Sequence, residues 1–168
     1  MEGINKNRNI LVADYANPQH AEDIVYLLNQ YALHPMGGGK PLDSAVVQNL
    51  VSELAKRSYA FSVLCYVNEA PAGLGNCMES FSSFKCKPIV NIHDLYVDGK
   101  YRGLGLSHAL MDKVEQIARE KRSGKITLEV LEGNQVAQAS YRKFGFAGYE
   151  LDPEMGRAMF WEKQLTYI

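Results

Sequence analysis

A strong charge imbalance, long apolar runs and paired cysteine motifs are all missing from this sequence. The 168 residues carry 18 Lys and Arg against 19 Asp and Glu, a net charge of −1. A chain so close to neutral has no general attraction for nucleic acid or an anionic membrane. No apolar run approaches the roughly 20 residues of a membrane span, and the start, MEGINKNRN, lacks the apolar centre of a signal peptide. We therefore expect a cytoplasmic protein without nucleic-acid or membrane partners.

Cysteine is also scarce. Cys65, Cys77 and Cys86 are odd in number, and their spacing fits neither a disulfide framework nor paired metal-ligand motifs. We predict free thiols and no metal. Hydrophobic residues make up 46% of the chain, enough for one sizeable core. Because there are no internal repeats or low-complexity segments, residues 1–168 are expected to form a single domain.

A strand, a glycine-rich loop and a helix are predicted in succession from Ile89 onward. The β-rich run Ile89–Val97 stops at Asp98-Gly99, and apolar residues recur at helical spacing from Leu106. The loop between them would aim free backbone N–H groups at one point, where the helix dipole adds positive charge. This predicts an anion site, at which glycines allow close approach and Arg102 supplies a fixed charge.

Three phosphate-binding motifs could describe this loop. A Walker A loop needs Gly-Lys-Ser/Thr at its end, whereas the sequence has Gly105-Leu106-Ser107. The dinucleotide fingerprint would place its third glycine at His108, which is too bulky for close helix–strand packing; an NAD(P)-binding domain is therefore disfavoured. The third motif, R/Q-x-x-G-x-G/A, is matched from Arg102 to Ser107 except that Ser107 replaces Gly or Ala. A helix start without any ligand is the alternative interpretation.

A second motif follows downstream. Alternating residues predict a strand over Lys125–Leu131, Glu132-Gly133 forms a turn, and Asn134 is a good N-cap for a helix that stops at Gly145. Within it stands N-x-x-A-x-x-x-Y-x-x-x-G-F, formed by Asn134, Ala137, Tyr141, Gly145 and Phe146. Tyr141 alone could be an ordinary core tyrosine. Together, in this order and spacing, the two motifs resemble those of the GNAT N-acetyltransferase superfamily.

The resemblance implies an α/β (α+β) fold, the GNAT fold. Its central, mostly antiparallel mixed sheet is splayed between the fourth and fifth strands and flanked by about four helices. From periodicity alone only a mixed α/β protein would follow. The remaining expected elements are strands at Asn9–Tyr15, Tyr59–Val67 and Leu74–Phe84, helices beginning at Pro18 and Leu42-Asp43, and a closing strand pair at Gly148–Leu151 and Met159–Leu165.

Two local features remain open. In the strand Ile89–Val97, alternation predicts that Ile92, Asp94 and Tyr96 face one way and His93, Leu95 and Val97 the other. The segment His34–Pro41 contains three consecutive glycines. It is either a flexible linker or a wall of the acceptor pocket.

Acetyl-CoA is the co-substrate that the resemblance implies, with its pantetheine arm in the strand splay and its pyrophosphate on the glycine-rich loop. The cofactor-binding residues so implied are Leu95, Tyr96, Val97, Arg102, Gly103, Leu104, Gly105, Leu106, Ser107, His108, Asn134, Ala137 and Tyr141.

Amine acylation needs a neutral nucleophile. An alkyl amine with a pKa of ~10.4 is only about one part in a thousand neutral at about pH 7.4, a deficit of roughly 4 kcal/mol. A carboxylate or imidazole should therefore help remove the proton. Asp94 is the first candidate base; Glu79 and His93 are weaker, because each could simply be a solvated or packed side chain. The resemblance makes Tyr141 the general acid and places an oxyanion-binding N–H within Leu95–Val97. No cysteine nucleophile is required.

The acceptor is suggested only by partial similarity to the diamine acetyltransferase branch, in the strand His93–Val97 and the tail Glu154–Phe160. Asp94 matches an acidic position that holds a polyamine cation, whereas His93 stands where that branch has a second acid. His93 and Asp94 are thus the substrate-binding candidates for a small primary amine. A peptide N-terminus, a lysine side chain and a non-catalytic acyl-CoA sensor remain alternatives, and homodimers are common in the superfamily.

Overall fold

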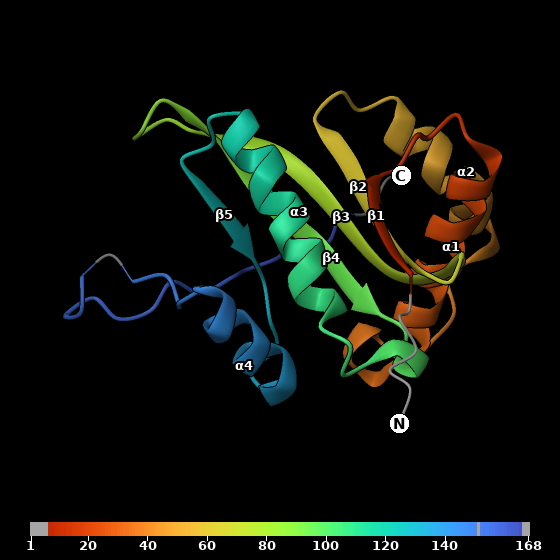
Figure 1. The fold of residues 1–168 in the computed structure, drawn as a ribbon. Helices are drawn as coiled ribbons and strands as arrows, with labels where there is room; N and C mark the ends of the chain where they lie inside the picture. Colours follow the sequence, from red (N-terminus) through yellow and green to blue (C-terminus); the bar gives the residue numbers. More distant parts are fainter. Residues whose placement is uncertain (1–6, 151, 166–168) are drawn as a thin grey trace.

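A five-stranded mixed sheet forms the centre of the computed structural model, which describes residues 7–150 and 152–165. The strands lie in chain order: β1 (Arg8–Val12), β2 (Ala60–Val67), β3 (Ala70–Ser82), β4 (Lys87–Val97) and β5 (Lys125–Leu128). The first four pair antiparallel, and β5 joins β4 in parallel (Figure 1). This confirms the expected mixed α/β fold class.

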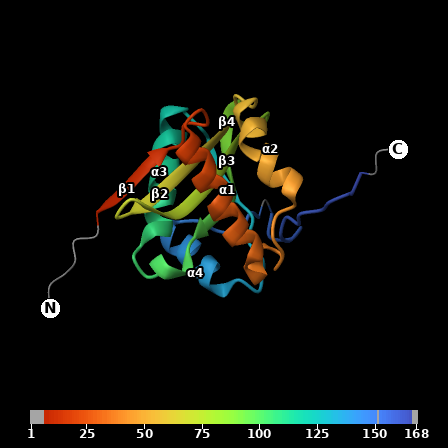
Figure 2. The same cartoon turned by 90° about the vertical axis from the view of Figure 1, so that its right-hand side faces the viewer.

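Helices cover both faces of the sheet. The helices α1 (Pro18–Leu33) and α2 (Ser44–Ala55) lie on one side and α3 (Leu106–Glu120) on the other, with α4 (Gln135–Phe144) beside α3 (Figures 1 and 2). Two short 3-10 turns follow α1 and β4, η1 (Pro35–Gly37) and η2 (Gly99–Tyr101). Each face has its own apolar core, centred on Ile24 and Leu27 of α1 and on Leu110 and Val114 of α3. The amphipathic patterns predicted these helices.

A β-bulge interrupts the pairing of β3 with β4. Asn76 lies opposite Asp94, whereas Cys77 lies opposite Ile92, so His93 is the extra residue on β4. The predicted alternation is therefore wrong on one side of the bulge. Ile92 packs into the α3 core together with Leu95 and Val97, while Tyr96 faces α1.

The strand splay follows from the short length of β5. Its pairing with β4 ends where Leu128 meets Ile92, so residues 93–97 continue without a neighbour on that side among the described residues. The predicted strand Lys125–Leu131 is thus three residues too long, because Glu129–Leu131 have left the sheet. β4 and the chain after β5 consequently diverge, as the resemblance implied.

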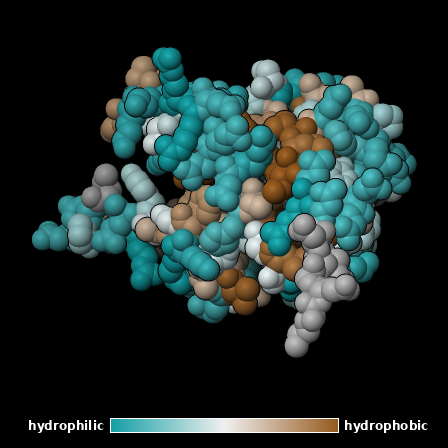
Figure 3. All heavy atoms as spheres, in the orientation of Figure 1, coloured by the Kyte–Doolittle hydropathy of each residue, from teal (hydrophilic) through white to brown (hydrophobic). Residues whose placement is uncertain are grey.

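The predicted closing strands at Gly148–Leu151 and Met159–Leu165 are not formed in the described residues. A single bridge, Glu150 to Arg157, is the only strand pairing among the described residues of this segment, and Leu151 lies outside the described residues. The part of the chain directly after α4 extends away from the sheet, and the trace then returns behind the sheet in the view of Figure 1. In the space-filling view a notch separates the extended part from the body of the molecule (Figure 3). An alternating pattern becomes a strand only when it pairs with a neighbouring strand, and apart from that bridge no such pairing is formed among the described residues of this segment.

Candidate active site

A cleft of about 940 Å³ opens where β4 and β5 diverge. One wall is the end of β4, Leu95–Val97, and the opposite wall is Glu129–Leu131 together with α4. The glycine-rich loop and the start of α3 close one end, and residues after α1 close the other. Segments far apart in the sequence therefore meet at the splay.

The glycine-rich loop presents backbone to this cleft. Gly103 and Gly105 have φ angles of 78° and 73°, in the left-handed region that favours glycine. An added Cβ would meet nothing within 4 Å at either position, so the backbone conformation, and not crowding, requires glycine. Helix α3 begins directly afterwards, with no side chain capping its N-terminus. Its first N–H groups are thus available to an anion beside the exposed Arg102.

Not every residue of the predicted loop faces the cleft. Leu104 does not line the cleft and packs against the α3 core, whereas Leu106, which is 1% exposed, belongs to that core and also contributes to the cleft lining. The His108 ring packs against Phe144 at a centroid distance of 5.6 Å. Ser107 lines the cleft, and its Oγ lies 3.3 Å from Oγ of Ser140 on α4. The serine that departs from the motif is therefore accommodated by a contact with the neighbouring helix.

The open edge of β4 carries unpaired donor positions. Just after β4, the Asp98 N–H donates to the carbonyl oxygen of Ala72 on β3, at an N···O distance of 2.9 Å. Hydrogen-bonding directions alternate along a strand, so the N–H groups of Leu95 and Val97 point to the opposite side. That side is the splay, where β5 has already ended. Two backbone donors therefore face the cleft.

Tyr141 lies on α4 and lines the same cleft. The helix begins at Asn134, whose side chain accepts a hydrogen bond from the Ala137 N–H at 3.2 Å, as the sequence predicted. Burial, with a smaller effect of nearby Tyr31, raises the pKa of Tyr141 to about 12. The phenol therefore stays protonated near neutral pH and can donate a proton but not act as a base.

The end of the cleft nearest α1 is aromatic. The rings of Tyr31 and Tyr96 stack at 5.7 Å, and His34 and Met36 of the following segment also line the cleft. Of the two interpretations of His34–Pro41, the wall of a pocket is thus the one that the structure favours. His93 is exposed in the cleft because the bulge turns it there.

Sequence reasoning missed several lining residues, among them Tyr31, Tyr101, Val136 and Ser140, whereas His34 and Met36 belong to the segment that it offered as a pocket wall. Tyr31 stands at helical spacing from Leu27 and Leu28, which by itself predicts only a core residue of α1.

Asp94 and Glu79 are separated by the fold. Asp94 is half-buried and does not itself line the cleft, although its neighbours His93 and Leu95 do. Its Oδ2 accepts a hydrogen bond from Nδ2 of Asn76 at 3.0 Å. Burial first, and then the negative charge of Asp94, raise the pKa of Tyr31. Glu79 instead pairs with Lys121 at 2.9 Å, away from the residues that line the cleft.

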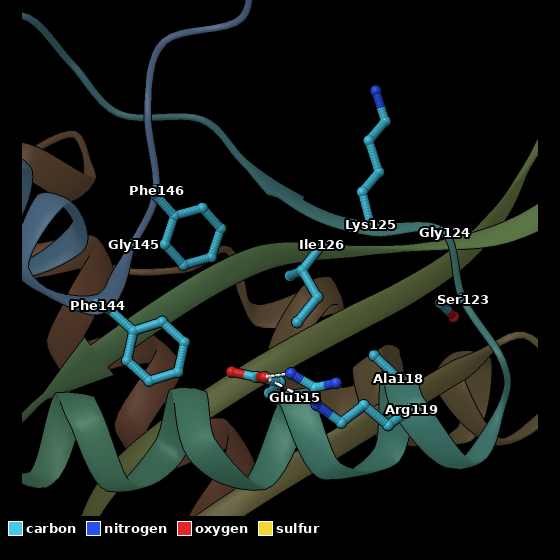
Figure 4. A pocket seen from close by; sticks show the side chains of 10 residues that line it. All are labelled: Glu115, Ala118, Arg119, Ser123, Gly124, Lys125, Ile126, Phe144, Gly145 and Phe146. Carbon is cyan, nitrogen blue, oxygen red and sulfur yellow. Dashed lines mark hydrogen bonds and ion pairs between the residues drawn. The ribbon is translucent and has the colours of Figure 1, made fainter.

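A second hollow of about 310 Å³ lies between α3 and β5 (Figure 4). Phe144, Phe146 and Ile126 give it an apolar wall, and the paired Glu115 and Arg119 stand on its α3 side. Over residues 7–150 and 152–165, no group of three His, Cys, Asp or Glu side chains could hold a metal, and no helix is long and apolar enough to cross a membrane.

Known proteins are similar to this chain in sequence and in fold. The sequence model of the Acetyltransferase (GNAT) family matches residues 21–146. A thialysine N-ε-acetyltransferase of Caenorhabditis elegans is 26% identical over 127 residues, 74% of this chain and 75% of that protein. Its Bos taurus namesake is 33% identical over 73 residues, 44% of this chain but only 42% of that protein. The solved structure of aminoglycoside N-acetyltransferase AAC(6′)-Iy with CoA has a TM-score of 0.74 at 18% identity, covering 98% and 100% of the two chains; it supports the fold alone.

Proposed function

Because this chain belongs to the acetyltransferase (GNAT) family, and so is an acetyl-CoA-dependent N-acetyltransferase, we propose that its cleft transfers the acetyl group directly to a small primary amine. One observation carries the proposal. The open donors of β4 and the Tyr141 hydroxyl lie in one cleft, which the glycine-rich loop closes at one end and an aromatic, acid-flanked pocket at the other.

The residues at the loop end fit acetyl-CoA. The pyrophosphate would be held by the N–H groups at the start of α3 and by Arg102, next to Gly103 and Gly105, whose left-handed backbone keeps the loop open. The pantetheine arm would lie along Leu95–Val97, because this part of β4 lines the cleft and has no strand partner on that side among the described residues. Leu104 and His108, both predicted as cofactor contacts, would instead hold the loop in place.

Three groups of the chain would then act on the reaction. Asp94, directly or through a water, would take the proton that the amine must lose. The N–H of Leu95 or Val97 would stabilise the developing oxyanion, a contribution worth about 10²–10³ in rate in other enzymes. Tyr141 would donate its proton to the departing thiolate of CoA. Glu79 is given no catalytic part.

The pocket chemistry favours a small cationic acceptor. The faces of Tyr31 and Tyr96 attract a cation, and Asp94 adds a negative charge behind them. Polyamines, thialysine-like amines and aminoglycosides all carry primary amines of this kind. Acetylation of a peptide N-terminus or a lysine side chain is the second candidate, and pure acyl-CoA sensing is disfavoured because a binder needs no proton donor at Tyr141.

The test mixes the purified chain with acetyl-CoA and single amines and follows free CoA thiol. The panel contains spermidine, putrescine, thialysine, an aminoglycoside, a lysine peptide and an N-terminal peptide. We expect turnover with a small amine and little with either peptide. Turnover only with peptides would overturn the small-amine acceptor, and thermal stabilisation by acetyl-CoA without any turnover would support the sensor.

We expect Gly103→Ala to raise the KM for acetyl-CoA about tenfold, because a left-handed φ costs an L-residue roughly 1–2 kcal/mol and would distort the loop. Gly99→Ala is the matched control: its φ is not in the left-handed region, and a Cβ there meets nothing within 4 Å. Steady-state kinetics with varied acetyl-CoA measure both. Equal KM values in the two variants would contradict the proposed pyrophosphate site.

We also propose a homodimer, in which a second copy covers the segment after α4. Met159, Phe160 and Trp161 are 70%, 81% and 78% exposed, and the outer edge of β5 has no strand neighbour within the described residues. Trp161 is the single tryptophan, so its emission should shift to the blue as concentration rises, in step with the mass from light scattering. A constant emission at monomer mass would contradict the dimer. The single-domain boundary and the cytoplasmic location stay predictions.

A further inference from the structure

We infer that Asn76 is a positioning residue for acetyl transfer, because it is the last link of a buried hydrogen-bond chain that holds the Asp94 carboxylate. This inference rests on the function proposed for Asp94. The chain runs from Tyr15, just after β1, through Ser62 on β2 and Asn76 on β3 to Asp94 on β4. It thus crosses the sheet with one polar side chain from each successive strand or its end.

Each contact in this chain has hydrogen-bonding geometry. The Tyr15 hydroxyl lies 2.9 Å from Ser62 Oγ, Ser62 Oγ donates to Asn76 Oδ1 at 2.7 Å, and Asn76 Nδ2 donates to Asp94 Oδ2 at 3.0 Å. The middle of the chain is shielded from water, since Ser62 is 0% and Asn76 3% exposed. Hydrogen bonds without competing water are stronger and orient their partners better.

The Asp94 carboxylate, at the end of this row of hydrogen bonds, determines which group donates in each of them. An ionised carboxylate only accepts, so the amide nitrogen of Asn76 must face Asp94 and its oxygen must face Ser62. Ser62 has a single hydroxyl proton, which Asn76 uses, so Tyr15 must donate to Ser62. Every proton in the chain therefore points toward Asp94, and the carboxylate is held by a row of aligned donors.

The β-bulge is what brings the last two residues together. If the ladder continued evenly from the pair Cys77–Ile92, His93 would lie opposite Asn76. The extra residue at His93 moves Asp94 into that place and leaves His93 exposed in the cleft. The bulge thus places the Asp94 carboxylate next to Asn76 and also leaves the His93 side chain in the cleft as a second polar group for the amine.

A purely structural role would not require this arrangement. Ser62 and Asn76 lie on the α1 face of the sheet, two residues along their strands from the buried Leu64 and Leu74. Replacing both members of a buried hydrogen bond by apolar groups of similar shape is often nearly neutral for stability. A polar row through such a core, ending on a carboxylate beside the cleft, indicates that the carboxylate's orientation matters.

The experiment compares Asn76→Asp, Ser62→Ala and Tyr15→Phe in kcat, in KM for the amine and in KM for acetyl-CoA. Asn76→Asp replaces the donor by an acceptor and should lower kcat/KM for the amine about 10- to 100-fold. The loss of kcat/KM should become smaller with distance from Asp94, to about fivefold for Ser62→Ala and about twofold for Tyr15→Phe. The KM for acetyl-CoA should stay unchanged, because none of these residues lines the loop end of the cleft.

Tyr66→Phe is the matched control. It removes a hydroxyl on the same face of the sheet that donates to Asp23 Oδ2 at 2.7 Å, in a chain that does not reach Asp94. The melting temperature of Tyr66→Phe should fall by about as much as that of Tyr15→Phe, while its kcat/KM for the amine should stay unchanged. If Tyr66→Phe loses as much activity as Ser62→Ala, the effect is structural and the inference is overturned.

Asp94→Asn separates this inference from the proposed function. If it abolishes turnover while folded Asn76→Asp and Ser62→Ala keep wild-type kcat/KM, the positioning chain is overturned and the role of Asp94 stands. If Asp94→Asn itself is fully active, the proposed role of Asp94 fails, and this inference fails with it. Should Asn76→Asp not fold, Ser62→Ala decides, because it deletes one atom.

Discussion

Tyr141→Phe should lower kcat by about 10²–10⁴ while leaving acetyl-CoA binding nearly intact. The substitution removes only the hydroxyl, so the ring keeps its edge contact with Phe146, at a centroid distance of 6.1 Å. The departing thiolate then loses its proton donor. Single-turnover release of CoA thiol measures the chemical step, and stabilisation by acetyl-CoA in a thermal melt reports binding.

The control for this variant is Tyr59→Phe, at an exposed tyrosine that does not line the cleft. It should keep wild-type kcat. A Tyr141→Phe enzyme with wild-type kcat, or one that no longer binds acetyl-CoA, would show that Tyr141 packs the cleft and does not donate a proton.

The pKa of Tyr141 also sets a pH dependence. A phenol whose pKa is raised from 10.0 to about 12 in the folded chain keeps its proton as the pH rises. Tyr141 should therefore cause no loss of activity on the alkaline side below about pH 12. By linkage, its contribution to stability is fully present below the unfolded value of 10 and is lost as the pH rises through about 12.

Asp94→Asn has the second large expected effect, a fall of about 10²–10⁴ in kcat/KM for the amine. Asparagine keeps the size of the side chain and can still accept from Asn76 Nδ2, so the network is preserved while the proton acceptor and the negative charge are lost. Initial rates at varied amine and saturating acetyl-CoA measure the effect.

Glu79→Gln makes the same loss of charge on the adjacent strand β3. Glu79 pairs with Lys121, and the pair is partly exposed. The substitution should therefore change kcat/KM for the amine by no more than about twofold and the free energy of unfolding by no more than about 1 kcal/mol. If Glu79→Gln matched Asp94→Asn, the assignment of the base would be wrong and the rejected candidate would have to be reconsidered.

The two halves of the cleft differ in how far local sequence predicts them. At the loop end, Gly103, Gly105 and the start of α3 follow from residues adjacent in the chain. At the acceptor end, Tyr31, His34 and His93 come from two distant elements. The loop end of this cleft can thus be predicted from motifs, whereas the acceptor end proposed here requires coordinates.

The pairing of β4 illustrates why alternation failed. A period of two predicts which side chains share a face only while the ladder is regular. The extra residue at His93 shows itself solely in the register between β3 and β4, and nothing in the run Ile89–Val97 marks it. The end of β5 at Leu128 was missed for a similar reason, because Val130 and Leu131 continue an apolar pattern after the pairing has stopped.

By itself the sequence determined the family, the order of the elements from the first strand through α4, the glycine-rich loop and the Asn134 cap. These depend on backbone conformation and hydrogen bonds between neighbours in the chain. Only the tertiary structure decided that Asp94 lies beside the cleft and Glu79 away from it, and that Asn76 and Ser62 stand behind Asp94. Such contacts depend on strand register and helix placement, which are set by packing across the whole core.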